Sequence, residues 1–396
     1  MREEKKKGRC LVSEDKDLSD LIRNVFSDDQ EKSESVENNK TVKLLTYKEQ
    51  LINECVTYLQ DNTFNNFVAA ISENIIGQEN LELLLVCVYN YITGVAREGE
   101  PSKINAIITA PSGCGKTETY RAIKSYFIYK IPSLIVDLVD ISKITPEGFK
   151  GYDTKVIIAS LMAAHTEGYG IIFLDEFDKR ISPQLDGSYN NISNDVQGQL
   201  LTLVEGIIVK YRDGKSVNEI DSGLTMFVGC GSFNAIRLNK KESSNRKSIG
   251  FINTNIDYDT YDDITRADML NAGCTYELLG RFSLIINYHK LNQDSALKII
   301  EKTRANVSKN LNLNIELTND YIDNLIDMTN SDYGCRLIYS TIFATALRAY
   351  TESLKINTCS CPVVTINGDN DYEICAHMSE NNKFDETEKY IGSYLN

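Results

Sequence analysis

The chain has 396 residues, enough for two or three domains with a sizeable buried core. Its 42 Lys and Arg against 56 Asp and Glu give a net charge of −14, which disfavours nucleic-acid binding because phosphate backbones are also negative. The hydrophobic fraction of 42% is typical of a globular protein, no apolar run is long enough to span a bilayer, and we expect no membrane partner. The charged start lacks the apolar core of a signal peptide, so we expect a cytoplasmic protein with reduced cysteines.

The first two thirds of the chain change from polar to helical and then to alternating patterns. Residues 13–40 are mostly polar, whereas apolar positions from Leu44 to Ile71 recur at helical spacing with a break near Asp61. From about residue 74, helical stretches alternate with apolar runs that we interpret as buried parallel strands, at 104–109, 133–139, 170–174 and 224–229. This alternation predicts an α/β fold with a doubly wound parallel sheet.

The last quarter of the chain predicts a second, smaller domain. Helical periodicity returns after about residue 288, and two strand-like runs at 362–366 and 372–376 flank Asn367-Gly368-Asp369, which predicts a hairpin. We therefore expect a divergent tail and helical segment at 1–70, a large α/β domain at 71–287, a small α+β domain at 288–380 and a C-terminal tail at 381–396.

The clearest motif is a glycine-rich loop between a predicted strand and a helical stretch: Ala110-Pro111-Ser112-Gly113-Cys114-Gly115-Lys116-Thr117. Such a loop binds phosphate because successive backbone N–H groups and the helix N-terminus face the anion. Lys116 would reach the outer phosphates and the Thr117 hydroxyl would ligate Mg²⁺, while Ala110 stands where the common pattern has Gly. The motif predicts a nucleotide site with a magnesium ion.

A pair of carboxylates follows a second predicted strand. Asp175 and Glu176 come directly after four apolar residues, at the strand end where ligands of parallel sheets bind. Asp175 would complete the Mg²⁺ shell, and Glu176 would orient and deprotonate the attacking water. Alone, this pair would be read as a solvated strand end, but together with the phosphate loop it indicates a hydrolytic site.

These motifs resemble those of the AAA+ ATPases, and in detail those of the ClpX-like unfoldase family, between about residues 74 and 376. Four further segments carry the resemblance in the same order: an adenine-side segment at Ile75-Ile76-Gly77-Gln78, a helix at 195–206, an arginine-finger segment at Leu279-Gly280-Arg281-Phe282 and a sensor-2 segment at Gly334-Cys335-Arg336. The resemblance implies that ATP is the nucleotide, that Arg281 acts on the site of a neighbouring subunit and that Arg336 contacts the phosphates in its own chain.

Two more segments resemble the working loops of that family. The sequence around Phe149 and Lys150 is similar to the pore loop that grips unfolded substrates, although Lys150 stands where ClpX has an aliphatic residue. Ile249-Gly250-Phe251, inside a polar insertion at 240–263, is similar to the loop that docks on the ClpP peptidase. Nothing before residue 74 resembles the family's N-terminal zinc-binding domain. Either Ser232 or Asn234 could be the polar sensor-1 residue.

The resemblance implies an ATP-dependent protein unfoldase that forms a homo-oligomeric ring, by analogy a hexamer. Such a ring would thread protein substrates through an axial pore and deliver them to a ClpP-type peptidase. The alternative is an AAA+ remodeller of folded protein assemblies or nucleic-acid complexes that has no peptidase partner. A third interpretation is a scaffold that binds ATP without hydrolysing it, and the presence of Glu176 and Arg281 argues against this one.

Overall fold

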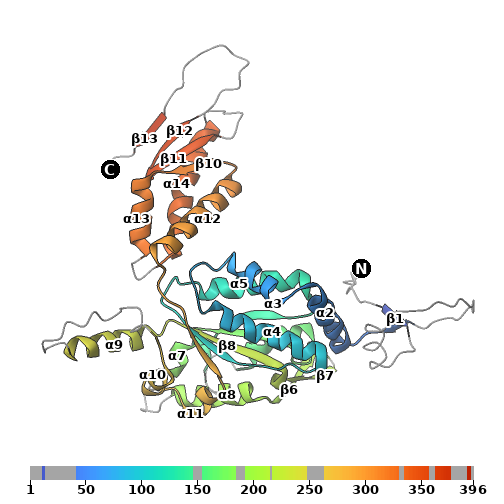
Figure 1. The fold of residues 1–396 in the computed structure, drawn as a ribbon. Helices are drawn as coiled ribbons and strands as arrows, with labels where there is room; N and C mark the ends of the chain where they lie inside the picture. The colour runs from blue at the N-terminus through green and yellow to red at the C-terminus, as the bar shows by residue number, and fades with distance from the viewer. Residues whose placement is uncertain are drawn as a thin grey trace, which may run out of the picture.

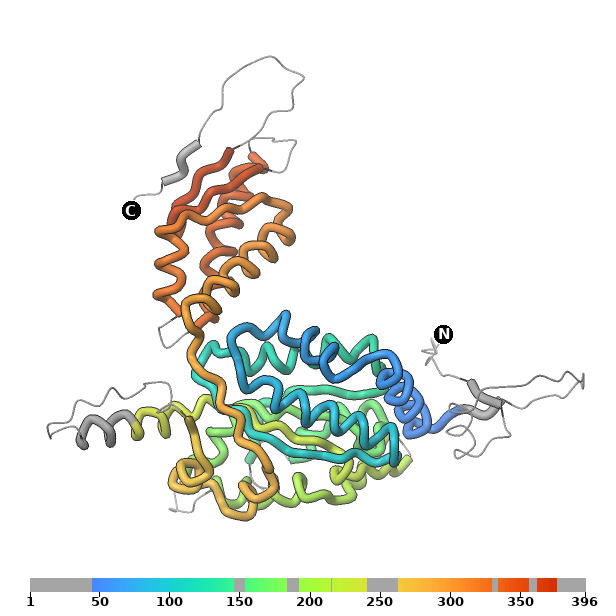
Figure 2. The backbone as a smooth tube through the Cα atoms, in the orientation of Figure 1, coloured from blue at the N-terminus to red at the C-terminus, as the bar shows by residue number. Residues whose placement is uncertain are grey.

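The computed structural model describes residues 11–13, 42–145, 154–183, 192–214, 216–247, 263–329, 334–355, 362–375 and 390–393. These residues form a large layered domain with a smaller domain at one end, joined by the strand and linker that follow residue 283 (Figures 1 and 2).

A parallel five-stranded sheet lies at the centre of the large domain, with strand order β4-β5-β8-β3-β9. Its strands are β3 (Ala106–Thr109), β4 (Val136–Asp140), β5 (Gly170–Asp175), β8 (Thr225–Gly231) and β9 (Leu284–Asn287). Strands buried on both faces need apolar side chains at successive positions, which is why three of the four apolar runs form β3, β5 and β8. The fourth run forms the edge strand β4, in which only Val136 is buried. The predicted α/β fold is confirmed, but β9 was not predicted.

Helices cover both faces of the sheet (Figure 1). Successive strand residues point to opposite faces, so Ile108 and Phe173 belong to one core while Ile107 and Ile172 belong to the other. The first core is covered by α2 (Tyr47–Asp61), α3 (Phe64–Ser72), α4 (Leu81–Glu98) and α5 (Lys116–Lys130). The second is covered by η2 (Thr154–Ile158), α6 (Ala159–Ala164), α7 (Asp178–Ile181), α8 (Ile192–Glu205), α10 (Arg266–Asn271) and α11 (Tyr276–Gly280).

The first two helices begin at side-chain caps. The hydroxyl of Thr46 accepts from the N–H of Glu49, whose carboxylate accepts from the N–H of Thr46. The hydroxyl of Thr63 caps α3 by accepting from the N–H of Asn66. The expected helical break near Asp61 lies between them. Both helices contribute buried side chains to the core that α4 and α5 share with the sheet.

Several elements project from or border these layers. They are the hairpin of β6 (Ile208–Asp213) and β7 (Ser216–Asp221), the 3₁₀ turns η1 (Ile141–Lys143) and η3 (Ser222–Leu224), helix α9 (Asn234–Lys247), and the paired strands β1 (Leu11–Ser13) and β2 (Val42–Leu44). Helix α9 extends away from the sheet into the insertion that the sequence placed at 240–263 (Figure 1).

The small domain has its own core. It consists of α12 (Gln293–Leu311), α13 (Asn319–Thr329), α14 (Arg336–Lys355) and a sheet ordered β10-β11-β12-β13, namely Asn314–Leu317, Val363–Gly368, Asp371–Cys375 and Tyr390–Ser393. The predicted hairpin is confirmed, although β11 runs to Gly368 and the turn is made by Asp369 and Asn370, because Asn370 adopts a left-handed φ of 64°.

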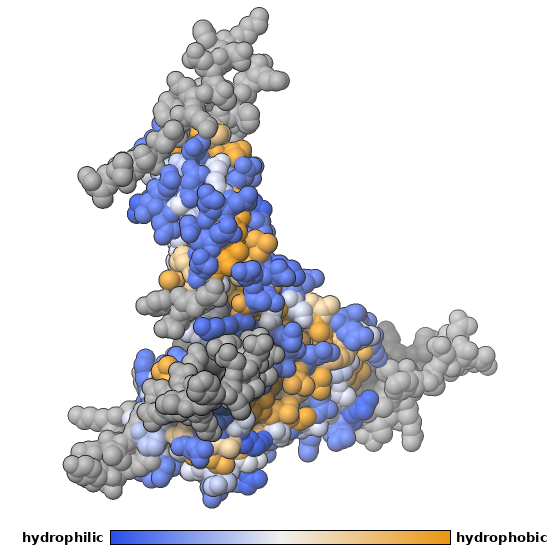
Figure 3. Space-filling view, turned by 60° about the vertical axis from the view of Figure 1, so that its left-hand side comes forward, coloured by the Kyte–Doolittle hydropathy of each residue, from blue (hydrophilic) through white to orange (hydrophobic). Residues whose placement is uncertain are grey.

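The described surface is mixed in polarity. Figure 3 shows apolar surface on the large domain beside hydrophilic regions that continue onto the small domain. Exposed apolar side chains include Leu83 and Val86 of α4 and Ile208 and Val217 of the β6–β7 hairpin. Within the described segments, every helix is too short or too polar to cross a bilayer.

Candidate active site

The phosphate loop follows the carboxyl end of β3, and α5 begins at Lys116. Gly113 and Gly115 have left-handed φ angles of 76° and 93°, which glycine adopts without a steric penalty. Ala110 is fully buried, and its N–H donates to the carbonyl of Gly231 on β8 at 3.1 Å. The first loop position therefore continues the strand, and a methyl group fits in the core where the common motif has Gly.

The ammonium of Lys116 contacts the carbonyls of its own loop. Nζ donates to the oxygen of Ala110 at 2.7 Å and to that of Pro111 at 3.2 Å. Burial lowers the pKa of Lys116, and the nearby positive charge of Arg336 lowers it further. The amine is thus already largely desolvated beside the place where phosphates are expected.

A cavity of about 720 Å³ opens between the phosphate loop and the small domain. Its size falls in the range of small-molecule sites. The large domain contributes Asn74, Ile75, Ile76, Gly113, Cys114, Gly115, Lys116, Thr117, Glu118 and Arg121. The linker and small domain contribute Leu291, Ile299, Lys302, Thr303, Asn306, Cys335, Arg336 and Tyr339. The predicted adenine-side, phosphate-loop and sensor-2 segments therefore line one cavity.

Two close contacts bring the small domain onto this cavity. Gly334, with a left-handed φ of 54°, packs on the phosphate loop so tightly that a Cβ there would lie 2.5 Å from the oxygen of Ser112. Lys302 of α12 donates to the oxygen of Glu73 at 2.7 Å and to Oδ1 of Asn74 at 3.0 Å. These contacts place Arg336, at the start of α14, on the wall opposite the loop.

Gln78 links the phosphate loop to the linker between the domains. Its buried amide donates to the oxygens of Cys114 (3.2 Å) and His289 (3.0 Å) and accepts from the N–H of His289 (3.0 Å). Gly77, at φ 76°, leaves no room for a Cβ because Ser295 Oγ lies 2.5 Å from that position. The adenine-side segment therefore packs on both the loop and the linker.

The carboxylates lie at the same edge of the sheet. Asp175 ends β5 and pairs in register with Asp140 at the end of β4. Burial raises the pKa of the Cys230 thiol; the nearby carboxylate of Asp175 raises it further and the nearby ammonium of Lys116 lowers it, so both charged groups lie near this thiol. Glu176 has a left-handed φ of 56°, and its pKa is raised by partial burial and by the neighbouring charges of Asp178 and Asp175.

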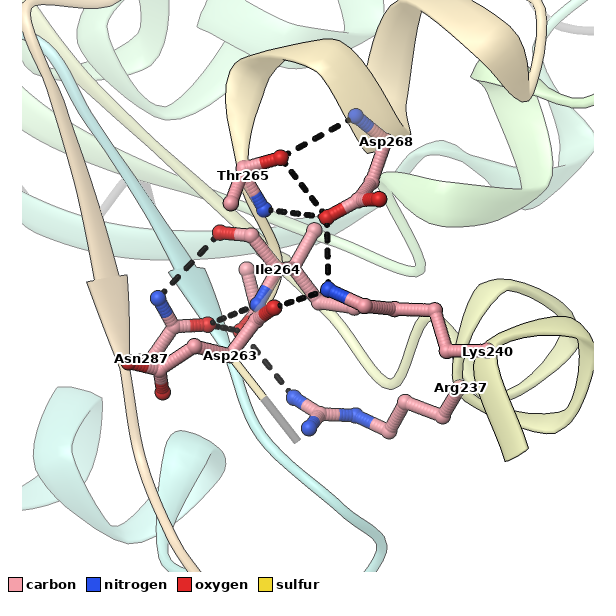
Figure 4. Close-up of polar contacts among 8 residues, drawn as sticks. Arg237, Lys240, Asp263, Ile264, Thr265, Asp268 and Asn287 are labelled. Atoms are coloured by element: carbon pink, nitrogen blue, oxygen red, sulfur yellow. Dashed lines mark hydrogen bonds and ion pairs between the residues drawn. The ribbon is translucent and has the colours of Figure 1, made fainter. Parts of the chain in front are cut away.

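The strand ends at this edge are joined by hydrogen bonds. The buried guanidinium of Arg237 donates through Nη2 to Thr109 Oγ1 (3.1 Å), which in turn donates to Asn287 Oδ1 (2.6 Å). Figure 4 shows Asn287 against the backbone of Ile264, and Lys240 of α9 between Asp263 and Asp268. The residues on either side of 248–262 are thereby attached to the sheet.

Arg281 lies near the amino ends of the strands, at the opposite end of the sheet from the phosphate loop. Arg281 precedes β9, and the first residue of β9 pairs with Ala106 at the start of β3. The phosphate loop begins after the last residue of β3, about 13 Å from Ala106 along the strand at 3.3 Å per residue. Its half-exposed guanidinium forms an ion pair with Glu205 at the end of α8. Arg281 is therefore placed away from the phosphates that its own loop would bind.

The predicted pore-loop residues Phe149 and Lys150 and the predicted docking residues Ile249, Gly250 and Phe251 lie outside the described residues. The sequence alone did not single out Gln78 as a link, Asp178 as a buried carboxylate, or Thr303, Asn306 and Tyr339 as cavity residues. Asp178 lies two positions after Glu176 in the sequence, and that position was a signal for it. The others depend on contacts between segments far apart in the chain.

Comparison with known proteins relates the chain to a family. The family model of the AAA domain (Cdc48 subfamily) matches residues 101–285, from just before β3 into β9. Two curated proteins, each an ATP-dependent Clp protease ATP-binding subunit ClpX, from two strains of Porphyromonas gingivalis, are 25% identical to the chain. Their alignments cover 72% of this chain and 74% of each relative.

Proposed function

Because the chain is an AAA+ ATPase that resembles ClpX, we propose that it is an ATP-dependent protein unfoldase. In this proposal a ring of identical chains, a hexamer by the same resemblance, hydrolyses ATP and threads protein substrates through its axial pore. It delivers the unfolded chains to a ClpP-type peptidase.

The observation that supports an ATP-driven machine best is the cavity shared by the two domains. Lys116 stands on its large-domain wall and Arg336 on its small-domain wall. A nucleotide whose phosphates contact both cations would hold the domains at one angle, and its hydrolysis would release them. The hydrogen bonds of Gln78 join the same loop to the linker, so a movement of the loop would be transmitted to the small domain.

The residues around the loop suit ATP with Mg²⁺. Mg²⁺ prefers oxygen ligands and is usually held by one or two carboxylates together with phosphates and waters. The hydroxyl of Thr117 and the carboxylate of Asp175 would supply those oxygens. Among the described residues, no cluster of three or more His, Cys, Asp or Glu side chains could hold a metal ion by itself. With Mg²⁺ held by Thr117 and Asp175, the site would offset part of the negative charge of the phosphates.

The remaining roles follow from position. Ile75 and Ile76 would contact the base, and the backbone from Ala110 to Thr117 would bind the phosphates. Glu176 would accept the proton of the attacking water. Arg281, turned away from its own site, would stabilise the charge that develops on the γ-phosphate of a neighbouring subunit.

Substrate threading and peptidase docking rest on the resemblance alone. Phe149 and Lys150 would form the gripping loop, and Ile249, Gly250 and Phe251 would insert into the peptidase. The relatives' name, a protease's ATP-binding subunit, supports a peptidase partner. The acidic net charge favours protein over nucleic acid as the substrate.

The test is ATP hydrolysis and degradation of a tagged folded protein, with and without a ClpP-type peptidase, by the parent and by Glu176→Gln and Phe251→Ala. We expect degradation by the parent, loss of both activities in Glu176→Gln, and loss of degradation with normal hydrolysis in Phe251→Ala. A parent that hydrolyses ATP but never unfolds the substrate would remove the unfoldase proposal. Salt-dependent binding to DNA by that parent would instead support the remodeller.

A further inference from the structure

Asp178 is the only buried carboxylate among the residues that the structure describes. It is the first residue of α7 and lies two positions after Glu176. Its residue is 7% exposed, whereas Asp175 and Glu176 are only partly buried. A buried carboxylate is costly unless its charge and hydrogen-bonding capacity are used, so its partners indicate what it does.

Both hydrogen bonds of the Asp178 carboxylate reach the neighbouring strand end. Oδ2 accepts from Oγ of Ser232 at 3.1 Å and from the N–H of Phe233 at 3.0 Å, and the ammonium of Lys179 lies 4.0 Å from the same oxygen. Ser232 and Phe233 form the turn after β8, and β8 pairs with β5. Asp178 therefore joins the turn after β5, which carries Glu176, to the turn after β8.

Both turns contain a residue in an uncommon backbone conformation. Glu176 and Phe233 have left-handed φ angles of 56° and 52° without being glycines. Such residues cost about 1–3 kcal/mol each and persist where their surroundings hold them. The bond from Phe233 N–H to Asp178 holds one turn, and the bond from Phe177 N–H to the oxygen of Cys230, at 2.8 Å, ties the other to β8.

The two turns pack tightly against each other. A Cβ at Gly231 would lie 2.7 Å from the ring of Phe233 and 2.8 Å from Oδ1 of Asp178. That Oδ1 is buried and accepts no hydrogen bond from any described residue.

We propose that Asp178 is a positioning residue for ATP hydrolysis, which orients Glu176 by tying its turn to Ser232 and Phe233. Ser232 is then the polar residue after β8 that is connected to the catalytic turn, whereas Asn234 is exposed at the start of α9. This inference rests on the proposed role of Glu176 and requires neither the pore nor the peptidase.

The experiment measures kcat and KM for ATP, nucleotide affinity with a fluorescent ATP analogue, assembly state and thermal stability. The variants are Asp178→Ala, Asp178→Asn, Ser232→Ala, Asn234→Ala and the double variant Asp178→Ala with Ser232→Ala. Glu176→Gln is the reference for loss of the base. Thr46→Ala, which removes the side-chain cap of α2 in another part of the large domain, controls for lost stability alone.

Asp178→Ala is expected to lower kcat by about 100-fold, because a misplacement near 1 Å costs a reaction roughly that much. KM and nucleotide affinity should change less than about twofold, since the phosphate loop is intact. Asp178→Asn keeps an acceptor oxygen and should retain most of kcat. Ser232→Ala should lower kcat, Asn234→Ala should not, and the double variant should fall no further than Asp178→Ala because the two residues act together.

The inference is overturned if Asp178→Ala keeps normal kcat, if it loses nucleotide affinity in proportion to kcat, or if Asp178→Asn is as impaired as Asp178→Ala. It also falls if Asn234→Ala lowers kcat and Ser232→Ala does not. If Glu176→Gln hydrolyses ATP normally, the role of Glu176 and this inference fail together. A parent that hydrolyses ATP yet unfolds nothing removes only the unfoldase proposal.

Discussion

Arg281 and Glu205 form an ion pair near the amino ends of the strands, and Lys116 lies at the opposite end of the sheet. Both side chains are about half exposed, so the pair adds little to stability and can open at small cost. Asn105 holds the backbone beneath it by donating to the oxygen of Arg281 at 3.2 Å. The backbone of Arg281 is thus held in place, while its guanidinium can leave Glu205 and pair with another anion.

If Arg281 acts on a neighbouring subunit, two inactive variants should restore each other. Arg281→Ala keeps its own phosphate loop, and Lys116→Ala keeps its arginine. Each alone should lose at least about 1,000-fold in hydrolysis, the usual weight of a trans arginine. In random mixtures about a quarter of the sites pair an intact loop with an intact arginine, so activity should reappear. Mixtures as inactive as the separate variants would show that Arg281 does not act in trans.

Gly334→Ala should weaken nucleotide binding. The new Cβ would lie 2.5 Å from the oxygen of Ser112 in a left-handed conformation, so the small domain must move off the loop. We expect at least a tenfold loss of affinity for a fluorescent ATP analogue, because the contacts from α14 are displaced. Gly198→Ala is the matched control: its Cβ meets nothing within 4 Å on α8, so affinity should be unchanged. Equal affinities in the two variants would contradict the prediction.

Gln78→Leu should destabilise the chain. It removes three hydrogen bonds and leaves the oxygens of Cys114 and His289 without this donor in a buried place. We expect a loss of about 1–3 kcal/mol in the free energy of unfolding, measured with urea. The exposed Gln293→Leu serves as a control and should change stability by less than about 0.5 kcal/mol. A Gln78→Leu variant as stable as that control would show that the link carries no energy.

Asp268 should make stability depend on pH. Burial acts to raise its pKa, but the hydrogen bonds from Lys240 and Thr265 outweigh burial, and the pKa is lowered. Its contribution is therefore present above about pH 3.9, the pKa of an unfolded aspartate, and is lost as the pH falls through the lower folded value. The stability difference between the parent and Asp268→Asn, about 1 kcal/mol near neutral pH, should shrink in acid. Lys240→Met should reduce the same effect, and a pH-independent difference would refute it.

Features made by residues close together in the sequence could be predicted, whereas features made by contacts between distant segments could not. The phosphate loop and the pair Asp175 and Glu176 are contiguous, and their chemistry needs neighbouring residues, so they were predictable with the strands that carry them. Strand β9 was missed because four residues, Leu284–Asn287, become a strand only through pairing with β3. The hairpin β6–β7 was missed because its exposed side chains follow no clear alternation.

The links within the site were out of reach for the same reason. Gln78 and His289 are 211 positions apart, and Asp178 and Ser232 are 54 positions apart. No local pattern connects such pairs, because their approach follows from the order of strands in the sheet. The choice between Ser232 and Asn234 likewise depends on which side chain meets Asp178.

The contacts of Lys302 with Glu73 and Asn74 have a consequence for how ligand binding is measured. Only molecules whose small domain is seated in this way offer both walls of the cavity. The observed dissociation constant is the intrinsic one divided by the fraction of seated molecules. A substitution that shifts that fraction, even at the far end of α12, would therefore change the apparent affinity without altering any group that touches the nucleotide.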